Sequence, residues 1–565
     1  MKKEQTFEMK KIIKKNNGIT LIALVITIIV LLILAGVTIA TLTGENGILT
    51  RASDASEQTE LADEREKVEL ATIGALAKEN GGEISQTSLE EELGKYFENG
   101  KYAVEPGTNE DGTEGYIVTI TENDEQGRTY FVDKNGNVED YIVREPAEPT
   151  EGTGTNFNMS YGVIEVEFLG GTSYNAKTTP NHPVLKEGMT AITYNESTGE
   201  TTNVSNSSGT DWYSYVAGSG ANDNNASHWA NAKVTVDSVD SYFVWIPRYA
   251  YRIIYFDSQD SENAYRSGTL TEEAALANNQ ILGYSDARGI VDTEGKTKEG
   301  VSVQTAISVN DKYFKTHPAF EDNVDYGGWS SKLEGIWIAK YEASKVGNKT
   351  TPKFEPGISS WRSITIGNMF TYAQRYNPTL NSHMMKNSEW GAVAYLTESK
   401  YGRNGTEVTI NNNSNYLTGN AGDNVSASSS TTTNAYNTEK GVLASSTGNI
   451  YGIYDLSGNA YEYVSGYYTG SSDLTNGSLF ANGISDAYST AYSGTTASSA
   501  YKYGDATYET NGWNSDDAYF VDWYYPFFYR GGCYDDTSNA GVFDFYSGYG
   551  NEKREFSFRV SLAVQ

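Results

Sequence analysis

The stretch that decides the fold is Trp523-Tyr524-Tyr525-Pro526-Phe527-Phe528-Tyr529-Arg530-Gly531-Gly532-Cys533-Tyr534-Asp535-Asp536, followed by Ala540-Gly541-Val542-Phe543 and Phe558-Arg559-Val560-Ser561-Leu562. Short runs of Gly, Val and Phe alternate here with Tyr, Asp and Ser. The first kind of run predicts buried strands. The second kind suits adaptable polar contacts around rings that lose little entropy when they are ordered. We therefore predict a β-rich C-terminus whose loops form a recognition surface.

The aromatic residues of this stretch have two interpretations. At Phe543 and Phe558, which stand in apolar runs, we favour packing in the core. At the Tyr, Asp and Ser positions between them we favour contact with a ligand, because aromatic rings on loops cover much area at little cost in entropy.

Two further motifs precede this stretch. Ser388-Glu389-Trp390-Gly391-Ala392-Val393-Ala394-Tyr395 predicts a helix over Glu389–Tyr395 with Ser388 as its N-cap. The other motif, further along the chain, is Gly452-Ile453-Tyr454-Asp455-Leu456-Ser457-Gly458-Asn459-Ala460-Tyr461-Glu462-Tyr463.

In chain order the first motif is Ser388–Tyr395, the second is Gly452–Tyr463 and the third is the C-terminal stretch. Together they resemble the formylglycine-generating-enzyme type of C-type lectin fold. The chain is more closely similar to the variable proteins of diversity-generating retroelements, which use that fold as a ligand-binding scaffold and diversify its terminal segment. The resemblance implies a variable binding region at about 513–565 on a framework that includes Arg530, Gly531, Gly532 and Arg559. It implies ligand contacts on one exposed face, made by Tyr524, Phe527, Phe528, Tyr534, Asp535, Asp536, Asp544, Tyr546 and Tyr549.

The chemistry of the related enzymes is not expected to carry over. They use two active-site cysteines that bind copper, and Cys533 is the only cysteine of this chain. The four histidines lack metal-ligand spacing, so we predict a binding protein and not an enzyme. In parts of the family the second motif supplies calcium ligands, which implies Asp455, Asn459 and Glu462 as a calcium site; no other cofactor is expected.

Charge and cysteine content exclude other classes. Lys and Arg number 42 against 73 Asp and Glu, a net charge of −31. Such a surface repels phosphate backbones, so no nucleic-acid partner is expected. A single cysteine excludes a fold held by intrachain disulfides.

The N-terminus has the pattern of a membrane segment. A lysine-rich leader, residues 1–18, precedes an uncharged apolar run that predicts a transmembrane helix over 19–44. Because the lysines favour the cytoplasmic side, we expect a single-pass protein of the cell membrane with its C-terminal domain outside. Gly18 before Ile19 resembles the type IV prepilin leader, which implies cleavage and N-methylation by a prepilin peptidase and contact with pilus machinery. The glutamate usual five residues after that cut is Ala23 here, which favours a minor or tip pilin, or an anchor outside a filament.

The remaining chain is predicted to contain two folded parts. Residues 45–144 should form a pilin-like helix and antiparallel sheet, and 145–156 a Pro-rich linker before a large domain over 157–565. The predicted fold class is therefore α+β: a long N-terminal transmembrane helix with a small pilin-like antiparallel sheet, then a large C-type lectin domain. In the first part we expect an amphipathic helix from Ile48 to Lys78, a helix over Ser88–Phe97, and strands at Gly115–Thr121, Arg128–Val132 and Val138–Val143. In the large domain we expect dense strands at Ser241–Ile254 and Gly335–Glu342, and polar surface excursions at Asn404–Asn449 and Gly470–Gly512.

Three functions follow as hypotheses. The first is a cell-surface receptor or adhesin that presents a diversifiable lectin-fold head to an unidentified protein or cell-surface ligand. The second is a minor or tip pilin of mainly structural role. The third is an enzyme on the same fold, which needs a metal or base constellation that the sequence does not show.

Overall fold

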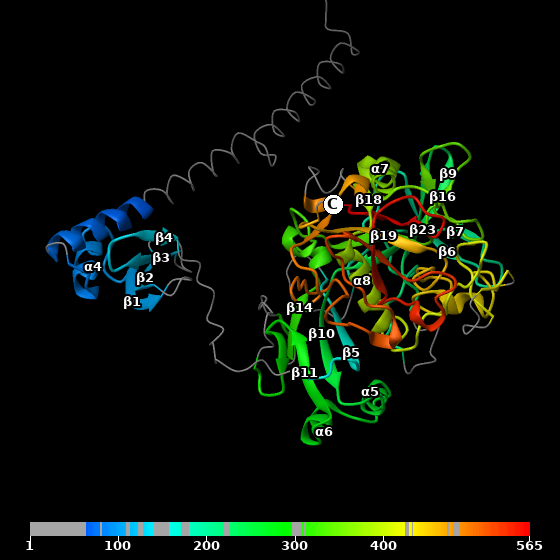
Figure 1. Cartoon of the computed structure of the whole chain (residues 1–565). Coiled ribbons are helices and arrows are strands. Elements are labelled where there is room, and N and C mark those ends of the chain that lie inside the picture. The colour runs from blue at the N-terminus through cyan, green and yellow to red at the C-terminus, as the bar shows by residue number, and fades with distance from the viewer. Residues whose placement is uncertain are drawn as a thin grey trace, which may run out of the picture. The chain divides into compact units, whose positions relative to one another are not determined.

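The computed structural model describes residues 64–79, 82–108, 113–121, 128–140, 157–170, 180–218, 227–296, 307–309, 312–423, 429–431, 433–471, 474–477 and 486–564. The chain divides into two compact units, Met1–Glu148 and Pro149–Gln565, which we describe separately (Figure 1). The predicted cleavage site at Gly18 and Ile19, the predicted helix over 19–44 and the linker at 145–156 lie outside the described residues.

The first unit packs helices on a small sheet. A helix over residues 64–78 and α4 (Gln86–Leu93) cover a four-stranded antiparallel meander. Its strands are β1 (Tyr102–Thr108), β2 (Glu114–Ile120), β3 (Arg128–Asp133) and β4 (Val138–Asp140). The core contains Val68, Ala71 and Leu89 from the helices and Val118 and Val132 from the sheet. The N-cap of α4 is Ser85: its hydroxyl accepts the N–H of Ser88, and the hydroxyl of Ser88 accepts the N–H of Ser85. The predicted start at Ser88 is therefore three residues late.

The predicted fold class is wrong, because it was built on a long N-terminal transmembrane helix. No helix among the residues that the structure describes is long and apolar enough to cross a membrane. The described helix over 64–78 instead has a mixed surface, with Val68 and Ala75 buried but Leu70 and Ile73 exposed among charged side chains. In its described parts the chain is dominated by β-sheets, with short helices packed on them.

The second unit is built on a sheet that joins distant parts of the chain. In the described residues its order is β18-β24-β15-β9-β8-β6-β7, and every neighbouring pair is antiparallel. Trp245 of β9 lies opposite Trp337 of β15, with ring centroids 5.2 Å apart. The strands are β6 (Met189–Tyr194), β7 (Thr201–Asn203), β8 (Asn231–Val236), β9 (Val239–Pro247), β15 (Gly335–Ala339), β18 (Ser382–Met384) and β24 (Val560–Leu562).

The predicted dense strand at Ser241–Ile254 is two strands. β9 ends at Pro247, which has no N–H to continue a ladder, and the next strand, β10, begins at Tyr249. Between them the buried guanidinium of Arg248 donates to the carbonyls of Leu333 (3.1 Å) and Leu169 (3.2 Å). The chain thereby passes from the first sheet directly into a second.

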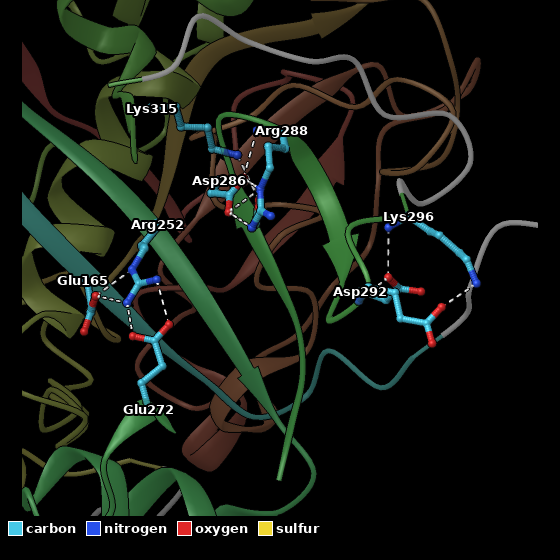
Figure 2. Close-up of polar contacts among 10 residues, drawn as sticks. Glu165, Arg252, Glu272, Asp286, Arg288, Asp292, Lys296 and Lys315 are labelled. Atoms are coloured by element: carbon cyan, nitrogen blue, oxygen red, sulfur yellow. Dashed lines mark hydrogen bonds and ion pairs between the residues drawn. The ribbon is translucent and has the colours of Figure 1, made fainter. Parts of the chain in front are cut away.

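The second sheet surrounds β10, whose residues are all buried. Its described members are β5 (Gly162–Phe168), β10 (Tyr249–Phe256), β11 (Ile281–Asp286), β12 (Gly289–Asp292), β13 (Ile307–Val309) and β14 (Lys312–Thr316). Arg252 of β10 binds Glu165 (2.7 Å) and, through two nitrogens, Glu272 (2.7 and 3.0 Å), as Figure 2 shows. This group fixes α6 (Glu272–Ala277) to the sheet, and α5 (Gln259–Arg266) lies close by in Figure 1.

A third sheet contains most of the C-terminal stretch. Its order is β20-β19-β21-β22, with β23 paired to β19, in the described residues. The strands are β19 (Tyr461–Tyr468), β20 (Thr490–Tyr492), β21 (Phe527–Arg530), β22 (Phe545–Gly548) and β23 (Phe556–Phe558), and a short hairpin is formed by β16 (Ser344–Lys345) and β17 (Pro352–Lys353).

Helix α8 (Asn387–Glu398) lies in the middle of this unit, and all of its residues are buried. It includes the helix predicted over Glu389–Tyr395, but it begins at Asn387, where Lys386 is the N-cap and its N–H donates to the carboxylate of Glu389 (3.0 Å). A helix that is apolar or small on every side is typical of a buried element. The other helix of this region, α7 (Ile366–Tyr376), packs on β18.

The predicted surface excursion Gly470–Gly512 contains a buried charge. Glu509 is 1% exposed and binds the ammonium of Lys315 (2.7 Å), the hydroxyls of Tyr251 (2.8 Å) and Tyr395 (2.9 Å), and the N–H of Gly504 (2.7 Å). Burial alone would raise the pKa of Glu509, but the charge and hydrogen bond of Lys315 outweigh it and lower that pKa to about 2. This segment is therefore fixed to β10, β14 and α8 instead of extending into solvent.

We expect replacement Glu509→Gln to cost about 3–5 kcal/mol of unfolding free energy at neutral pH, because it leaves the buried charge of Lys315 unpaired. The native pKa lies below the ordinary value of 4.5, so the stabilisation by Glu509 is complete above about pH 4.5 and is lost as the pH falls toward 2. Urea unfolding of both proteins between pH 7 and pH 3 should show the difference shrinking below pH 4.5. A difference that is constant over this range would contradict the assignment.

Candidate functional site

Segments far apart in the sequence meet around the buried side chain of Arg530, the last residue of β21. Its guanidinium donates to Asn387 Oδ1 at the start of α8 (2.9 Å), to the carbonyl of Asp544 (2.7 Å), and to the carbonyls of Asp505 and Ala506 (both 3.0 Å). Burial lowers the pKa of Arg530 to about 10, so the group stays charged at neutral pH. Arg530 also lies 5.5 Å from the ring centroid of Trp390, so it joins the C-terminal stretch, the third motif, to the Ser388–Tyr395 motif, the first.

A second buried arginine joins the second and third motifs. Arg559, between β23 and β24, donates to both oxygens of Glu462 on β19 (2.6 and 3.0 Å). The same guanidinium donates to the carbonyl of Ala339, the last residue of β15, and to that of Tyr454 in the loop before β19 (both 2.8 Å). All three motifs therefore contact one another through two arginines that are closed to solvent.

The structure brings six of the nine predicted ligand residues to the surface of this frame. Two of them, Tyr524 and Asp535, are exposed, and four are partly exposed: Tyr534, Asp536, Tyr546 and Tyr549.

The other three, Phe527, Phe528 and Asp544, are core residues and do not belong to an exposed face. β21 is paired with β19 on one side and β22 on the other and is covered on both faces, so the neighbouring rings of Phe527 and Phe528 are both fully buried. Asp544 is 1% exposed, and burial raises its pKa. Their predicted role as ligand contacts is therefore corrected.

Three exposed aromatic residues were missed: Tyr519, Trp523 and Tyr525. Their exposed fractions are 53%, 62% and 39%, and that of Tyr524 is 49%. The signal was present in the sequence, because Asp522 precedes three aromatic residues and Pro526, a pattern typical of a turn. We call the following group the aromatic surface: Tyr519, Trp523, Tyr524, Tyr525, Tyr546 and Tyr549.

The turn before β21 presents these rings. The carboxylate of Asp522 accepts the N–H groups of Tyr524 and Tyr525, both at 2.7 Å. Ring centroids are 5.4 Å apart for Trp523 and Tyr524, and Tyr549 lies 4.8 Å from Tyr524 and 4.7 Å from Tyr525. These are edge-to-face contacts, so the rings order one another by direct packing.

The aromatic surface continues onto the sheet. Tyr546 of β22 stacks on Tyr529 of β21, with centroids 5.4 Å apart and planes at 13°, and it lies 4.4 Å from the exposed Tyr519. Because Tyr529 is mostly buried, the half-exposed ring of Tyr546 is supported from below by the core of the sheet.

The loop after β21 has a different character. The carboxylate of Asp536 accepts the N–H of Cys533 (2.7 Å) and the hydroxyl of Tyr461 (3.0 Å), so it holds the turn. Asp535 remains exposed, and Tyr534 lies edge-to-face with Tyr416, 4.9 Å away. Cys533 is buried, and burial raises the pKa of its thiol, which is thereby kept protonated and unreactive.

Two of the three predicted calcium ligands are engaged by other residues, whereas Asn459 Oδ1 is buried without a hydrogen-bond partner among the described residues, so the calcium site stays a prediction. Asp455 and Glu462 are buried, but Asp455 accepts Asn411 Nδ2 (2.9 Å) and the N–H of Gly419, and both oxygens of Glu462 accept Arg559. Asn459 donates to Ser360 Oγ (2.8 Å). A calcium ion here would compete with the charge of Arg559, and across the described parts of the chain no group of His, Cys, Asp and Glu is arranged to hold a metal ion.

Comparison with known proteins gives no further assignment: no family model matches the chain, and no curated protein matches it.

Unfolding free energies test the assignment of Phe528 to the core and of Trp523 to the surface. We expect Phe528→Ala to cost about 3–5 kcal/mol of unfolding free energy, because it empties a core site. Trp523→Ala should change that free energy by no more than about 0.5 kcal/mol, because the ring is mostly in solvent. Denaturant unfolding of the two variants checks both values, and similar losses in the two would contradict the division.

Proposed function

We propose that the C-terminal unit is a ligand-binding module and that the aromatic surface is its contact face. The observation that carries this proposal is the exposure of four aromatic side chains between residues 519 and 525, led by Trp523 at 62%. Trp and Tyr are the side chains that most often supply binding energy at protein interfaces. A contiguous exposed patch of such rings is typical of an interaction site.

The support under these rings favours binding over a purely structural role. Asp522 fixes the turn, Tyr529 supports Tyr546, and Arg530 fixes the strand between them. Rings that are ordered before the ligand arrives lose little entropy on binding. The arrangement also separates the residues that hold the fold from those that would meet the ligand, so the surface can vary without loss of the core.

The proposed ligand is a protein or another component of a cell surface, which makes the chain a receptor or adhesin. The net charge of −31 disfavours nucleic acid as the partner. The exposed carboxylate of Asp535 adds an acceptor at the edge of the face. The proposal assigns binding and no catalysis to this surface.

The test is binding to arrays of purified surface proteins and glycans, followed by titration of each hit with variants of the full chain. Replacement of Trp523 and Tyr524 together by Ala should weaken a true hit by about tenfold or more, because such anchors contribute roughly 1–3 kcal/mol each. Tyr96→Ala is the matched control, since Tyr96 is an aromatic residue with 37% exposure in the other unit. Hits whose affinity is the same in the double variant, the control and the unchanged chain would contradict the proposal.

A further inference from the structure

A second site is suggested by a pocket lined by tyrosines, formed from residues that do not belong to the aromatic surface. Its volume is about 320 Å³, within the range of small-molecule sites. Tyr194 ends β6, Tyr242 lies in β9, Tyr341 follows β15, and Tyr436 comes from the polar segment predicted as a surface excursion. Two carboxylate residues, Glu200 and Glu355, also line the pocket.

The rings are held at a fixed angle to one another. Tyr341 and Tyr436 have planes at 83° and centroids 6.2 Å apart, so the two rings pack edge to face. Tyr436 is fixed in turn, because its hydroxyl donates to the carbonyl of Gly199 (3.3 Å) and its own carbonyl accepts the hydroxyl of Tyr454 (2.8 Å). The pocket is therefore built by tertiary contacts and does not depend on one loose loop.

The side chain of Tyr341 is only 1% exposed, so the rings that the pocket offers to a ligand are mainly the partly exposed ones of Tyr242 and Tyr436.

The charged residues that line the pocket favour a positively charged ligand. Within the described structure, Lys, Arg and His are absent from the lining of this pocket. Glu355 is paired with Lys353 (2.9 Å), but the exposed carboxylate of Glu200 has no ion-pair partner among the described residues. Behind the lining, the ammonium of Lys340 lies 4.7 Å from the ring centroid of Tyr194 and is bound by Asn231 Oδ1 (2.9 Å); burial lowers its pKa.

We propose that this pocket binds an organic ammonium group. The faces of aromatic rings attract cations, and Tyr242 and Tyr436 supply partly exposed rings in the same pocket as the exposed carboxylate of Glu200. An anion would be repelled by Glu200 and by the ring faces.

Two sources can supply this group: a free quaternary ammonium compound or a lysine side chain of a protein. Choline and Nα-acetyl-lysine amide represent them, and each is titrated into the purified full chain by calorimetry. The neutral isostere 3,3-dimethyl-1-butanol has the shape of choline without its charge, and methyl glucoside represents a sugar. We expect saturable 1:1 binding of at least one cation, with the isostere weaker than choline by about tenfold if choline is the ligand.

Variants locate the site. Tyr436→Ala should weaken cation binding by about fivefold or more, and Glu200→Gln by about two- to fivefold. Glu187→Gln, at another exposed glutamate of the same unit, is the control for a general charge effect.

The proposal is overturned if neither cation binds, if the isostere binds as tightly as choline, or if methyl glucoside is the only ligand. It is also overturned if Glu187→Gln weakens binding as much as Glu200→Gln. The aromatic surface is unchanged in all these variants, so this result is independent of the test of the proposed function.

Discussion

The buried ion pair between Arg559 and Glu462 is the interaction on which the C-terminal unit depends most. Both side chains are closed to water, and the guanidinium also donates to the backbone of Ala339 and Tyr454. These contacts join the first sheet, the third sheet and the loop of the second motif that precedes β19. Taking two charges out of water is costly, and the geometry repays that cost only while every donor has its acceptor. Removal of either partner leaves a buried charge uncompensated.

Arg530 has the corresponding role near the aromatic surface. Its donors reach α8, the residue before β22, and the carbonyls of residues 505 and 506, so they fix the strand whose preceding turn presents Trp523 and Tyr524. The two buried arginines come from β21 and from the residue between β23 and β24, whereas the exposed aromatic side chains proposed to bind come from the turn before β21 and from β22 and its flanks. A frame of this kind tolerates change at the surface because none of the surface rings takes part in the arginine contacts.

The sequence predicted the framework better than the surface. The helix of the first motif, the strand at Gly335 and the buried places of Phe543 and Phe558 could be predicted because apolar runs of fixed length leave few alternatives. Phe527 and Phe528 were misassigned because the pattern of a strand does not show whether its second face is covered.

Other errors arose from contacts between residues distant in the sequence. The segment Gly470–Gly512 looks like a solvated loop until Glu509 meets Lys315, almost 200 positions earlier, a pairing that no local pattern reveals. The tyrosines of the pocket come from four separate segments for the same reason. The predicted transmembrane helix rested on residues 19–44, and the helices of the described residues do not provide one.

The central claim is that the Arg559–Glu462 pair joins the motifs as one unit, and a double-mutant cycle tests it most directly. Unfolding free energies are measured for Arg559→Met, Glu462→Met and the double variant. The account predicts that each single change costs about 3–5 kcal/mol, and that the double variant loses clearly less than the sum, because it leaves no buried charge unpaired. Single losses below about 1 kcal/mol, or losses that simply add, would contradict it.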